Sequence, residues 1–496
     1  MSTIKAATLV LGLFVIAASP IWLQAQTQTC PAPNKLICVI PLLYDPSGNK
    51  VGVNLPNQAH SAHFDSDFQA NVAAALNSSV GTELTSLRLA SPTSGITFVF
   101  EGGVLRRSTE SYGPILGERA ETIGRHRVFV AGTYQYFPFS TLDGIDLKRL
   151  PAVYNHADTV NPNGTHRNPA TDPPSPGVPG VELEYIRTNN RVDLKVHQFT
   201  FYATYGLTNR IDVSVAIPIL NVRLGVTSDA TIVRTLDTVP QGAALKAAWE
   251  MNPNIYPGNL YPGTGPMEGC QNTPAGCTGY FHYFDPMNPA TSLTARFPNA
   301  KTASGIGDVL FRAKGTVFKR ERTAVAFGTD VRVPTGDENN FLGAGAAGVK
   351  PFLSASYHAR LSPHANIGYE FNGSSILAGN PVTKTKGRLP DQLFYSAGVD
   401  AGLTHKLTVA VDLLGQRFYE APGMKIGPWE DVNNKFHSDI PQISQIHHSF
   451  NTDDLALGAK YSPFGNWLVT GNVQIKLDDG GLRAKVVPLI GVSYTF

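Results

Sequence analysis

The sequence has little charge and few long apolar runs. Charged residues make up 16% of the 496 residues, and the net charge is +2 with no long run of one sign. Nucleic-acid binding needs a basic stripe, so this class of function and partner is excluded. Beyond residue 25 no stretch of 18 apolar residues occurs. A helical anchor in an inner membrane is therefore not expected.

Cysteine is also scarce, since the chain has only Cys30, Cys38, Cys270 and Cys277. The spacings C-x7-C and C-x6-C match no zinc pattern. Both pairs lie in Pro-, Gly- or Asn-containing segments, which favours two local disulfides in an oxidising compartment over a metal site, although the connectivity stays open. Glycine and proline are plentiful, with 47 and 36 residues. Many turns are therefore expected, and a helical bundle is disfavoured.

The N-terminus has the pattern of a secretory signal. Lys5 is followed by the apolar run "AATLVLGLFVIAA" and by "LQA" at 23–25. A positive charge, an apolar core and a cleavage site of small residues are typical of a signal peptide, here residues 1–25 with cleavage after Ala25. The alternative is a buried N-terminal helix, because the run is short for a membrane span. The pattern predicts an exported protein.

From residue 126 onward the chain predicts a barrel. Segments of about ten residues with two-residue alternation recur, the length a tilted strand needs to cross a bilayer. Twelve of them begin near residues 126, 192, 210, 307, 323, 350, 364, 393, 406, 454, 466 and 485. Their connections alternate between short and long, and the long ones are 143–190, 225–304, 334–349, 373–391 and 420–452. Antiparallel strand order with short periplasmic turns and long outer loops forces this alternation, whereas a soluble sandwich gives no reason for it.

We therefore predict an all-β fold, a transmembrane antiparallel up-and-down β-barrel of about 12 strands over residues 126–496. Its location would be the outer membrane of a Gram-negative bacterium. The two faces of the predicted strands agree with this, because Val325, Phe327 and Val331 alternate with Asp330 and Arg332. Aromatic residues predict two interfacial belts. The outer belt would hold Phe137, Phe139, Phe371, Phe394, Tyr395, Phe418 and Tyr419, and the inner belt Tyr205, Tyr461, Phe464, Trp467, Tyr494 and Phe496.

The last ten residues, "VPLIGVSYTF", place Ile490, Val492, Tyr494 and Phe496 on one face. This segment resembles the insertion signal of bacterial outer-membrane proteins. The resemblance implies that these side chains face lipid and that the barrel-assembly machinery contacts Phe496. The alternative is a soluble protein whose last strand alternates by chance.

Residues 26–125 lack the two-residue alternation of the predicted barrel strands. "HFDSDFQANVAAAL" places Phe64, Phe68, Val72 and Leu76 on one stripe of a helix, and "GTELTSLRLA" continues it. We predict a partly helical N-terminal periplasmic segment that either fills the lumen as a plug or hangs below it. A plug is favoured, because a wide lumen otherwise stays open to water.

Three motifs carry a family resemblance. These are "FTFYATYGLTNRIDVSVAIPIL" at 199–220, "GIGD" at 305–308 and "PTGD" at 334–337. Over about residues 190–496 the sequence resembles a family of Gram-negative outer-membrane proteins labelled with the MetA pathway of phenol degradation or as transporter-like. The resemblance implies an outer-membrane barrel that passes hydrophobic or aromatic compounds, and it brings no catalytic residues. "GIGD" is not a phosphate loop, because it lacks the third glycine and opens a strand.

Ionisable side chains cost several kcal/mol on the lipid face, so those on strands are predicted to face the lumen. The lumen-lining candidates are Lys195, His197, Asp308, Arg312, Lys314, Asp330, Arg332, His358, Arg360, Glu370, Asp400, Asp412 and Lys460. The mixed faces of the strand near 192 suggest a bulge there. Because both signs occur, the candidates form either ion pairs that brace the wall or a polar lining that selects a permeant. No charge selectivity is predicted.

An enzyme is the third function class. In "QIHHSF" (445–450), His447 and His448 precede Ser449, with Asp453 and Asp454 nearby. A triad needs convergence in space, and adjacent residues of an extended chain point apart. We therefore predict that the protein is not an enzyme and needs no cofactor. The same histidines with His156, His166 or His282 form an alternative surface metal site.

Aromatic outer loops, "NLYPGTGPM" (259–267) and "GYFHYFDPM" (279–287), suggest either capture of an apolar solute or a lid. The sequence thus predicts an outer-membrane channel or facilitated-diffusion porter for small, hydrophobic or aromatic compounds. The alternative is a non-transport surface protein whose extracellular loops bind a ligand.

Overall fold

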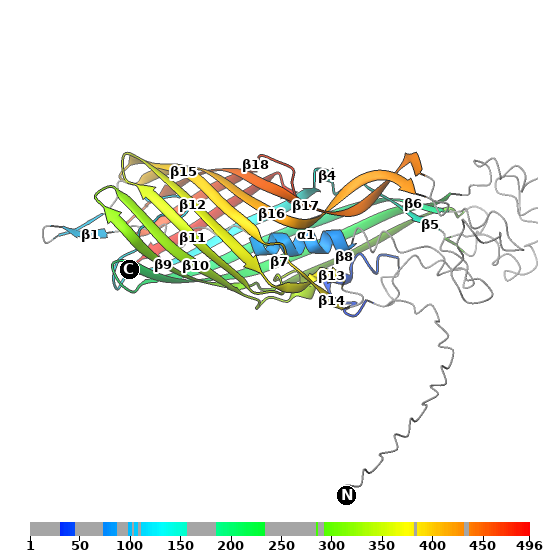
Figure 1. Ribbon diagram of the computed structural model, residues 1–496, viewed down its shortest axis with the longest axis horizontal. Coiled ribbons are helices and arrows are strands. Elements are labelled where there is room, and N and C mark those ends of the chain that lie inside the picture. Colours follow the sequence, from blue (N-terminus) through cyan, green and yellow to red (C-terminus); the bar gives the residue numbers. More distant parts are fainter. Residues whose placement is uncertain are drawn as a thin grey trace, which may run out of the picture.

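The computed structural model describes residues 30–44, 73–86, 98–101, 104–107, 111–155, 185–233, 284–285, 292–380, 384–430 and 436–496. Antiparallel strands dominate, and twelve of them close into a barrel whose axis is horizontal in Figure 1. The predicted fold class is therefore confirmed.

Each of the twelve predicted segments corresponds to one barrel strand. The strands are β3 (Val128–Leu142), β6 (Tyr185–Gly206), β7 (Ile211–Val233), β9 (Val309–Arg320), β10 (Thr323–Val333), β11 (Gly348–Tyr357), β12 (Leu361–Asn372), β15 (Gln392–Thr404), β16 (Leu407–Glu430), β17 (Phe436–Tyr461), β18 (Trp467–Lys476) and β20 (Val486–Thr495). Each pairs with the next. The barrel closes where β20 pairs with β3, from Leu489↔Gln135 to Thr495↔Phe129.

The other described strands lie at the two ends. The hairpin of β1 (Phe98–Glu101) and β2 (Val104–Arg107) projects from the left end of Figure 1. At the other end are β4 (Ile145–Asp146), β5 (Leu150–Asn155), β8 (Thr294–Ile306), β13 (Ser374–Asn380), β14 (Thr385–Arg388) and β19 (Leu482–Ala484). β8 pairs with the far part of β7 and leads into β9 across a break at Gly307 and Asp308.

The short turns all lie at one end, which the architecture of outer-membrane barrels identifies as periplasmic. They are residues 207–210, 321–322, 358–360, 405–406 and 462–466. The opposite, extracellular connections differ from the expected loops. β16 runs to Glu430 and β17 begins at Phe436, so most of the expected loop 420–452 is a β-hairpin. Strand pairing continues past the membrane because water solvates a charged outer face there.

Apolar residues face outward and polar residues inward. On β10, Phe327 is 49% exposed on the outer wall whereas Asp330 is 1% exposed inside. On β20, Ile490 is 63% exposed, and Val492 and Phe496 share its face. An apolar outer wall is stable only against hydrocarbon, so the predicted lipid-facing stripe is confirmed.

The periplasmic aromatic belt forms as predicted on the outer wall. Trp467 lies 5.0 Å from Tyr494 between ring centres, and Tyr494 lies 4.6 Å from Phe496. The extracellular belt needs correction, because Phe137 and Phe418 are buried inside the barrel and Phe394 lines a cavity in the lumen. On the outer wall Tyr369 packs with Phe371 and Tyr419 instead, with ring centres 4.8 and 6.0 Å apart.

Candidate functional site

Three described pieces of the N-terminal part of the chain lie inside the barrel, whereas the β1–β2 hairpin lies outside it. The first, residues 30–44, contains the 3-10 helix η1 (Leu36–Cys38) and packs at the extracellular end. Asn299 Nδ2 of β8 donates to Val39 O at 2.9 Å, and Lys35 Nζ contacts Asp337 Oδ2 at 2.7 Å. A disulfide joins Cys30 and Cys38, as predicted, with Cα atoms 5.9 Å apart. Cys270 and Cys277 lie outside the described residues.

The second piece is helix α1 (Ala74–Ser86), which lies within the barrel in Figure 1. Its buried hydroxyls find acceptors: Ser78 Oγ donates to Leu377 O at 3.0 Å, and Thr82 Oγ1 donates back to Ser78 O at 2.8 Å. Of the predicted helical stripe, Leu76 lies in α1, and "GTELTS" continues the helix as expected. Phe64, Phe68 and Val72 lie outside the described residues.

Gly81 lets α1 approach strand β13 of the extracellular β13–β14 hairpin closely. A Cβ atom at this position would lie 2.8 Å from Leu377 Cβ. Because real Cβ contacts are longer, a side chain here would force the helix away from β13.

The third piece, residues 111–123, fills the periplasmic part of the lumen. Lys314 Nζ on β9 donates to Glu118 Oε1 at 2.7 Å and to the carbonyl oxygens of Arg119 and Glu121, both at 2.8 Å. Lys460 Nζ on β17 donates to Pro114 O at 2.5 Å. A buried ammonium group is costly without partners, and this segment supplies oxygen atoms to both lysines.

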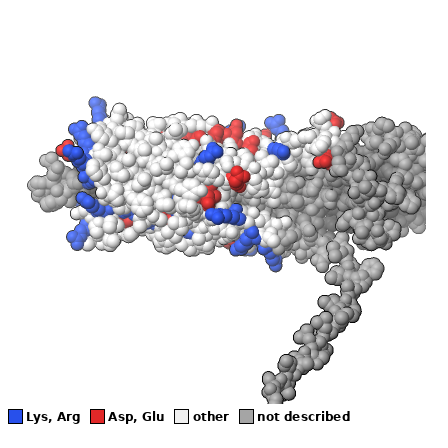
Figure 2. Space-filling view, viewed as in Figure 1, with Lys and Arg blue, Asp and Glu red and all other residues white. Residues whose placement is uncertain are grey.

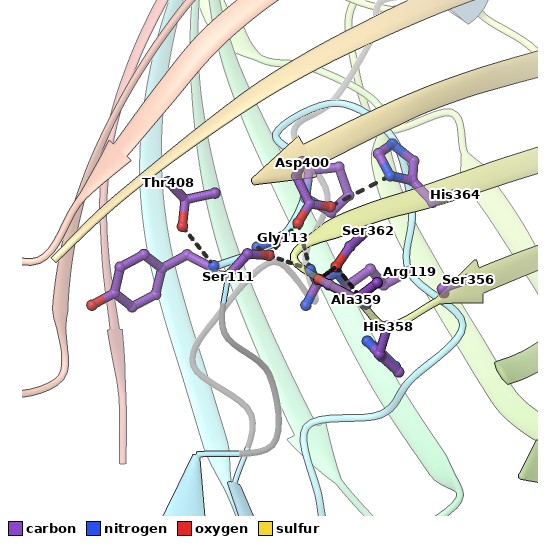
Figure 3. Close-up of polar contacts among 12 residues, drawn as sticks. Ser111, Gly113, Arg119, Ser356, His358, Ala359, Ser362, His364, Asp400 and Thr408 are labelled. Atoms are coloured by element: carbon purple, nitrogen blue, oxygen red, sulfur yellow. Dashed lines mark hydrogen bonds and ion pairs between the residues drawn. The ribbon is translucent and has the colours of Figure 1, made fainter. Parts of the chain in front are cut away.

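A second polar cluster ties the same segment to the facing wall (Figure 3). Arg119 Nη2 lies 2.6 Å from Asp400 Oδ2, and Ser111 Oγ bonds to both groups. His364 lies between two carboxylates, with Nε2 2.6 Å from Asp412 Oδ1 and Nδ1 3.5 Å from Asp400 Oδ1. These contacts support the first interpretation of the charged residues, in which ion pairs brace the wall.

At the periplasmic mouth Glu121 bonds to His358 of the β11–β12 turn. Burial raises the pKa of the Glu121 carboxyl, but the hydrogen bond and charge of His358 outweigh it, so this pKa lies below its ordinary value. The carboxylate is therefore the form that holds the segment at the mouth.

A cavity of about 190 Å³ lies between α1 and residues 111–123. Leu84 of α1 and Leu116 of the lower segment face it from the two sides. Its remaining apolar lining comes from the wall and from one loop, through Pro218, Leu220, Leu310, Leu342, Phe352, Phe394 and Leu414. The cavity is thus a chamber in the middle of the lumen with a largely apolar lining.

One wall of the chamber is charged, but its charges are paired. Arg312 makes two contacts to Asp330, at 2.6 and 2.8 Å, and Lys350 Nζ lies 3.2 Å from the same carboxylate. Arg332 contacts Glu370 at 3.1 Å and Asp308 at 3.4 Å. No ring of a single sign forms among the described lining residues.

Two aromatic rings of the chamber each lie against a cation. The Lys350 ammonium is 4.3 Å from the centre of the Phe394 ring, and the Arg312 guanidinium is 4.9 Å from that of Phe352. Cations over ring faces are held by the ring quadrupole. The rings and the ion pairs therefore fix one another's positions around the chamber.

The "GIGD" and "PTGD" motifs meet beside the chamber. Asp308 accepts from Gly336 N at 3.1 Å and from Ala344 N at 2.8 Å, and Thr335 Oγ1 donates to Gly307 O at 2.6 Å. These bonds hold the loop after β10 across the break between β8 and β9. The sequence predicts two separate turns, and it gives no sign that they form one structure.

The structure places most of the candidate residues inside the barrel. These are Asp308, Arg312, Lys314, Asp330, Arg332, Glu370, Asp400, Asp412 and Lys460. Several charged partners are absent from the candidates, namely Glu118, Arg119 and Glu121 on the lumen segment and Lys350 and His364 on the wall. The run "GERAE" at 117–121, which places three charges in an otherwise apolar approach to the first strand, was the available signal.

Lys195 and His197 need correction, because they lie on the outer face of β6 with Phe199 and Phe201. The register of β6 with β3 and β7 has no shift, so the expected bulge is not present. His197 Nδ1 lies 2.8 Å from Tyr134 OH, and Lys195 pairs with Asp193 at 2.9 Å.

Arg360 and His358 also differ from the prediction. Arg360 is exposed in the β11–β12 turn, and His358 lies in the same turn at the mouth. Both residues follow the end of β11 at Tyr357, so the two-residue alternation no longer determines which side of the wall they face.

Among the described residues, the alternative catalytic and metal sites gain no support. Ser449 Oγ accepts from Glu420 N at 3.1 Å, whereas His448 lies 3.5 Å from Asp143 and Asp454 pairs with Arg483. Within the described ranges no cluster of three or more His, Cys, Asp or Glu side chains is arranged to hold a metal ion.

His156, His166, His282 and residues 259–267 lie outside the described residues, as does most of 279–287. No helix in the described part of the chain is long and apolar enough to span a membrane.

A closed barrel of twelve tilted strands, with an apolar outer wall and short turns at one end, defines an outer-membrane β-barrel protein. Over residues 282–423 the chain matches the family described as "Putative MetA-pathway of phenol degradation", which confirms the resemblance that the motifs indicate.

Several solved structures are similar. The COG4313 outer membrane channel from Pseudomonas putida F1 is 10% identical, with 76% of this chain and 98% of that chain covered and a TM-score of 0.40. A Pseudomonas aeruginosa FadL homologue is 8% identical, covering 75% and 90% with a TM-score of 0.28. The Pseudomonas putida toluene transporter TodX is 11% identical, covering 76% and 91% with a TM-score of 0.24. No curated protein matches the chain.

Proposed function

We propose that the protein is a passive outer-membrane channel for small hydrophobic or aromatic compounds, with no enzymatic step. The observation that carries the proposal is the central chamber of about 190 Å³. Its size and apolar lining suit one small apolar molecule. Its charged groups are already neutralised by one another, so an apolar solute need not separate an ion pair to enter.

We further propose that the N-terminal residues 26–125 act as a plug, of which residues 111–123 form the movable part. The contacts of this lower piece are mainly hydrogen bonds and ion pairs, which water can replace when the piece leaves. The upper piece packs its apolar side chains against the wall and is closed by a disulfide, so its release would expose apolar surface.

A larger side chain in the chamber tests whether the solute passes through it. We expect Leu414→Trp to abolish uptake of the fluorescent aromatic probe N-phenyl-1-naphthylamine into Gram-negative cells that depend on this protein, because the larger side chain occupies the chamber. The matched control is Leu413→Trp, whose position is 45% exposed to lipid on the same strand. The matched family is described by phenol degradation, so phenol is the second solute to try.

Heat-modifiable gel mobility shows whether each variant is folded. Unchanged uptake by folded Leu414→Trp would contradict the chamber as the route. Binding of the probe without uptake by wild type would favour the surface-protein alternative.

We also propose that the barrel-assembly machinery recognises β20 through Phe496. This side chain is 63% exposed next to the Tyr494 ring. We expect Phe496→Ala to reduce the amount of folded barrel in the outer membrane by about tenfold, measured by heat-modifiable mobility of membrane fractions. Phe464→Ala is the control, because Phe464 is 66% exposed in the β17–β18 turn at the same end. Equal losses in both variants would point to a general role of the aromatic belt.

A further inference from the structure

The periplasmic rim of the barrel is basic. In the short turns, in the strand ends beside them and in the lead into β3, the described exposed charges are Arg125, Arg210, Lys319, Arg320, Arg322, Arg360 and Lys406, with Glu321 as the acidic exception. Figure 2 shows this as blue side chains gathered at the left end of the barrel, whereas red and blue alternate farther right. At the extracellular end opposite charges pair, as in Arg296 with Asp229 at 2.8 Å.

The rim lies immediately beyond the periplasmic aromatic belt. Tyr205 of the belt is followed within five residues by Arg210, and His126 Nδ1 lies 2.9 Å from Tyr205 OH. Aromatic belts mark the level of the lipid headgroups, so the cations lie at the level of the phosphates of the inner leaflet. Acidic lipids attract such basic segments.

A groove opens in the outer wall directly above part of this rim. It has a volume of about 630 Å³ and follows the seam where β20, β3 and β6 meet. Phe201 lines one side, and Trp467, Tyr494 and Phe496 line the other. Gly132 lies in the middle of the lining, where a Cβ atom would come within 3.9 Å of the Phe201 ring. The missing side chain leaves an apolar trough that faces hydrocarbon.

The foot of this seam carries cations of the rim. Arg125, His126 and Arg127 precede β3, and Arg210 follows β6. Arg125 N donates to Asn209 Oδ1 at 3.1 Å, and His126 N donates to Gly206 O at 2.7 Å. These bonds hold the two basic segments side by side below the groove.

We propose that an acidic phospholipid of the inner leaflet docks on this seam, with an acyl chain in the groove and its phosphate at Arg125 and Arg210. An aliphatic chain fits an aromatic-walled trough open to lipid, and the cations complement an anionic headgroup. A second copy of the chain is a poorer occupant, because a two-fold contact would bring like charges of the two rims together.

A lipid bound at this seam would affect barrel closure. β20 and β3 are the last and first barrel strands, and their pairing completes the ring. A lipid bound across β20, β3 and β6 contacts both sides of that junction and therefore stabilises the closed barrel.

The test uses the full-length protein, stripped of lipid in neutral detergent. Native mass spectrometry measures binding of phosphatidylglycerol and of phosphatidylcholine, and the boiling-dependent gel shift measures the unfolding temperature. We expect phosphatidylglycerol to bind and to raise this temperature, and the double variant Arg125→Gln/Arg210→Gln to weaken its binding about tenfold. The control Arg360→Gln/Lys406→Gln removes two rim charges from other turns and should leave binding unchanged.

Gly132→Leu tests the groove without altering charge, and we expect it to weaken phosphatidylglycerol binding as well. The proposal is overturned by equal binding of the two lipids, by equal losses in the two double variants, or by wild-type binding of folded Gly132→Leu. It is also overturned if inorganic phosphate alone raises the unfolding temperature as phosphatidylglycerol does. None of these readouts depends on solute passage, so the proposal stands or falls separately from the channel.

Discussion

Lys314→Met should open the barrel to ions. The ammonium group of Lys314 is buried and makes three hydrogen bonds to residues 118–121 of the lumen segment. Hydrogen bonds to charged groups contribute about 1.5–3 kcal/mol each. Their loss should shift the balance between the docked and the released segment by more than about tenfold. In planar bilayers we expect frequent openings of the variant and rare openings of the wild type.

Lys319→Met is the matched control, because Lys319 is exposed at the periplasmic end of the same strand. The variant that lacks residues 26–125 gives the conductance of the fully open barrel. The openings of Lys314→Met are compared with this value. If the deletion conducts no better than the wild type, these residues do not close the lumen. If Lys314→Met stays closed while the deletion conducts, the contacts of Lys314 do not hold the segment.

Asp330→Asn should strongly destabilise the barrel. Asp330 is buried and neutralises both Arg312 and Lys350, at distances of 2.6 to 3.2 Å. Removal of one partner from a buried ion pair costs about 3–5 kcal/mol, because a buried charge is left without compensation. Asparagine keeps the shape of the side chain, so the effect reports the charge. We expect a large fall in the temperature at which heat-modifiable mobility is lost.

Asp193→Asn provides the comparison. Asp193 pairs with Lys195 at 2.9 Å, but this pair lies on the outer face of β6 with both side chains more than a third exposed. Exposed pairs contribute about 0–1 kcal/mol, so little change is expected. Similar losses in the two variants would mean that the wall of the chamber is well hydrated and that its ion pairs do not brace the barrel.

The two asparagine variants compare an aspartate inside the barrel, Asp330, with one on its outer face, Asp193. Twelve strands were predictable because the bilayer requires each of them to be apolar outside and polar inside. This alternation is visible in the sequence of a single strand. Asp330 obeys this rule. Lys195 and His197 do not, because β6 continues beyond the hydrocarbon, where the outer face is wet and charge is tolerated. The sequence around them shows alternation but not the depth at which the membrane ends.

The lumen contacts were beyond prediction for a different reason. Lys314 and Glu118 are 196 residues apart in sequence, and no local pattern links them. The alternation assigns Lys314 to the interior, but it does not say which partner neutralises it. The same holds for Asp308, whose motif is visible in the sequence while its acceptor role for Gly336 and Ala344 depends on how a distant loop folds back.

Two described parts of the N-terminal segment lie on opposite sides of the membrane. The disulfide loop at Cys30–Cys38 lies at the extracellular end of the lumen, whereas the β1–β2 hairpin projects from the periplasmic end (Figure 1). The same N-terminal segment therefore has described parts at both ends of the barrel. A single protein sequence thus presents separate surfaces to the two compartments that the outer membrane divides.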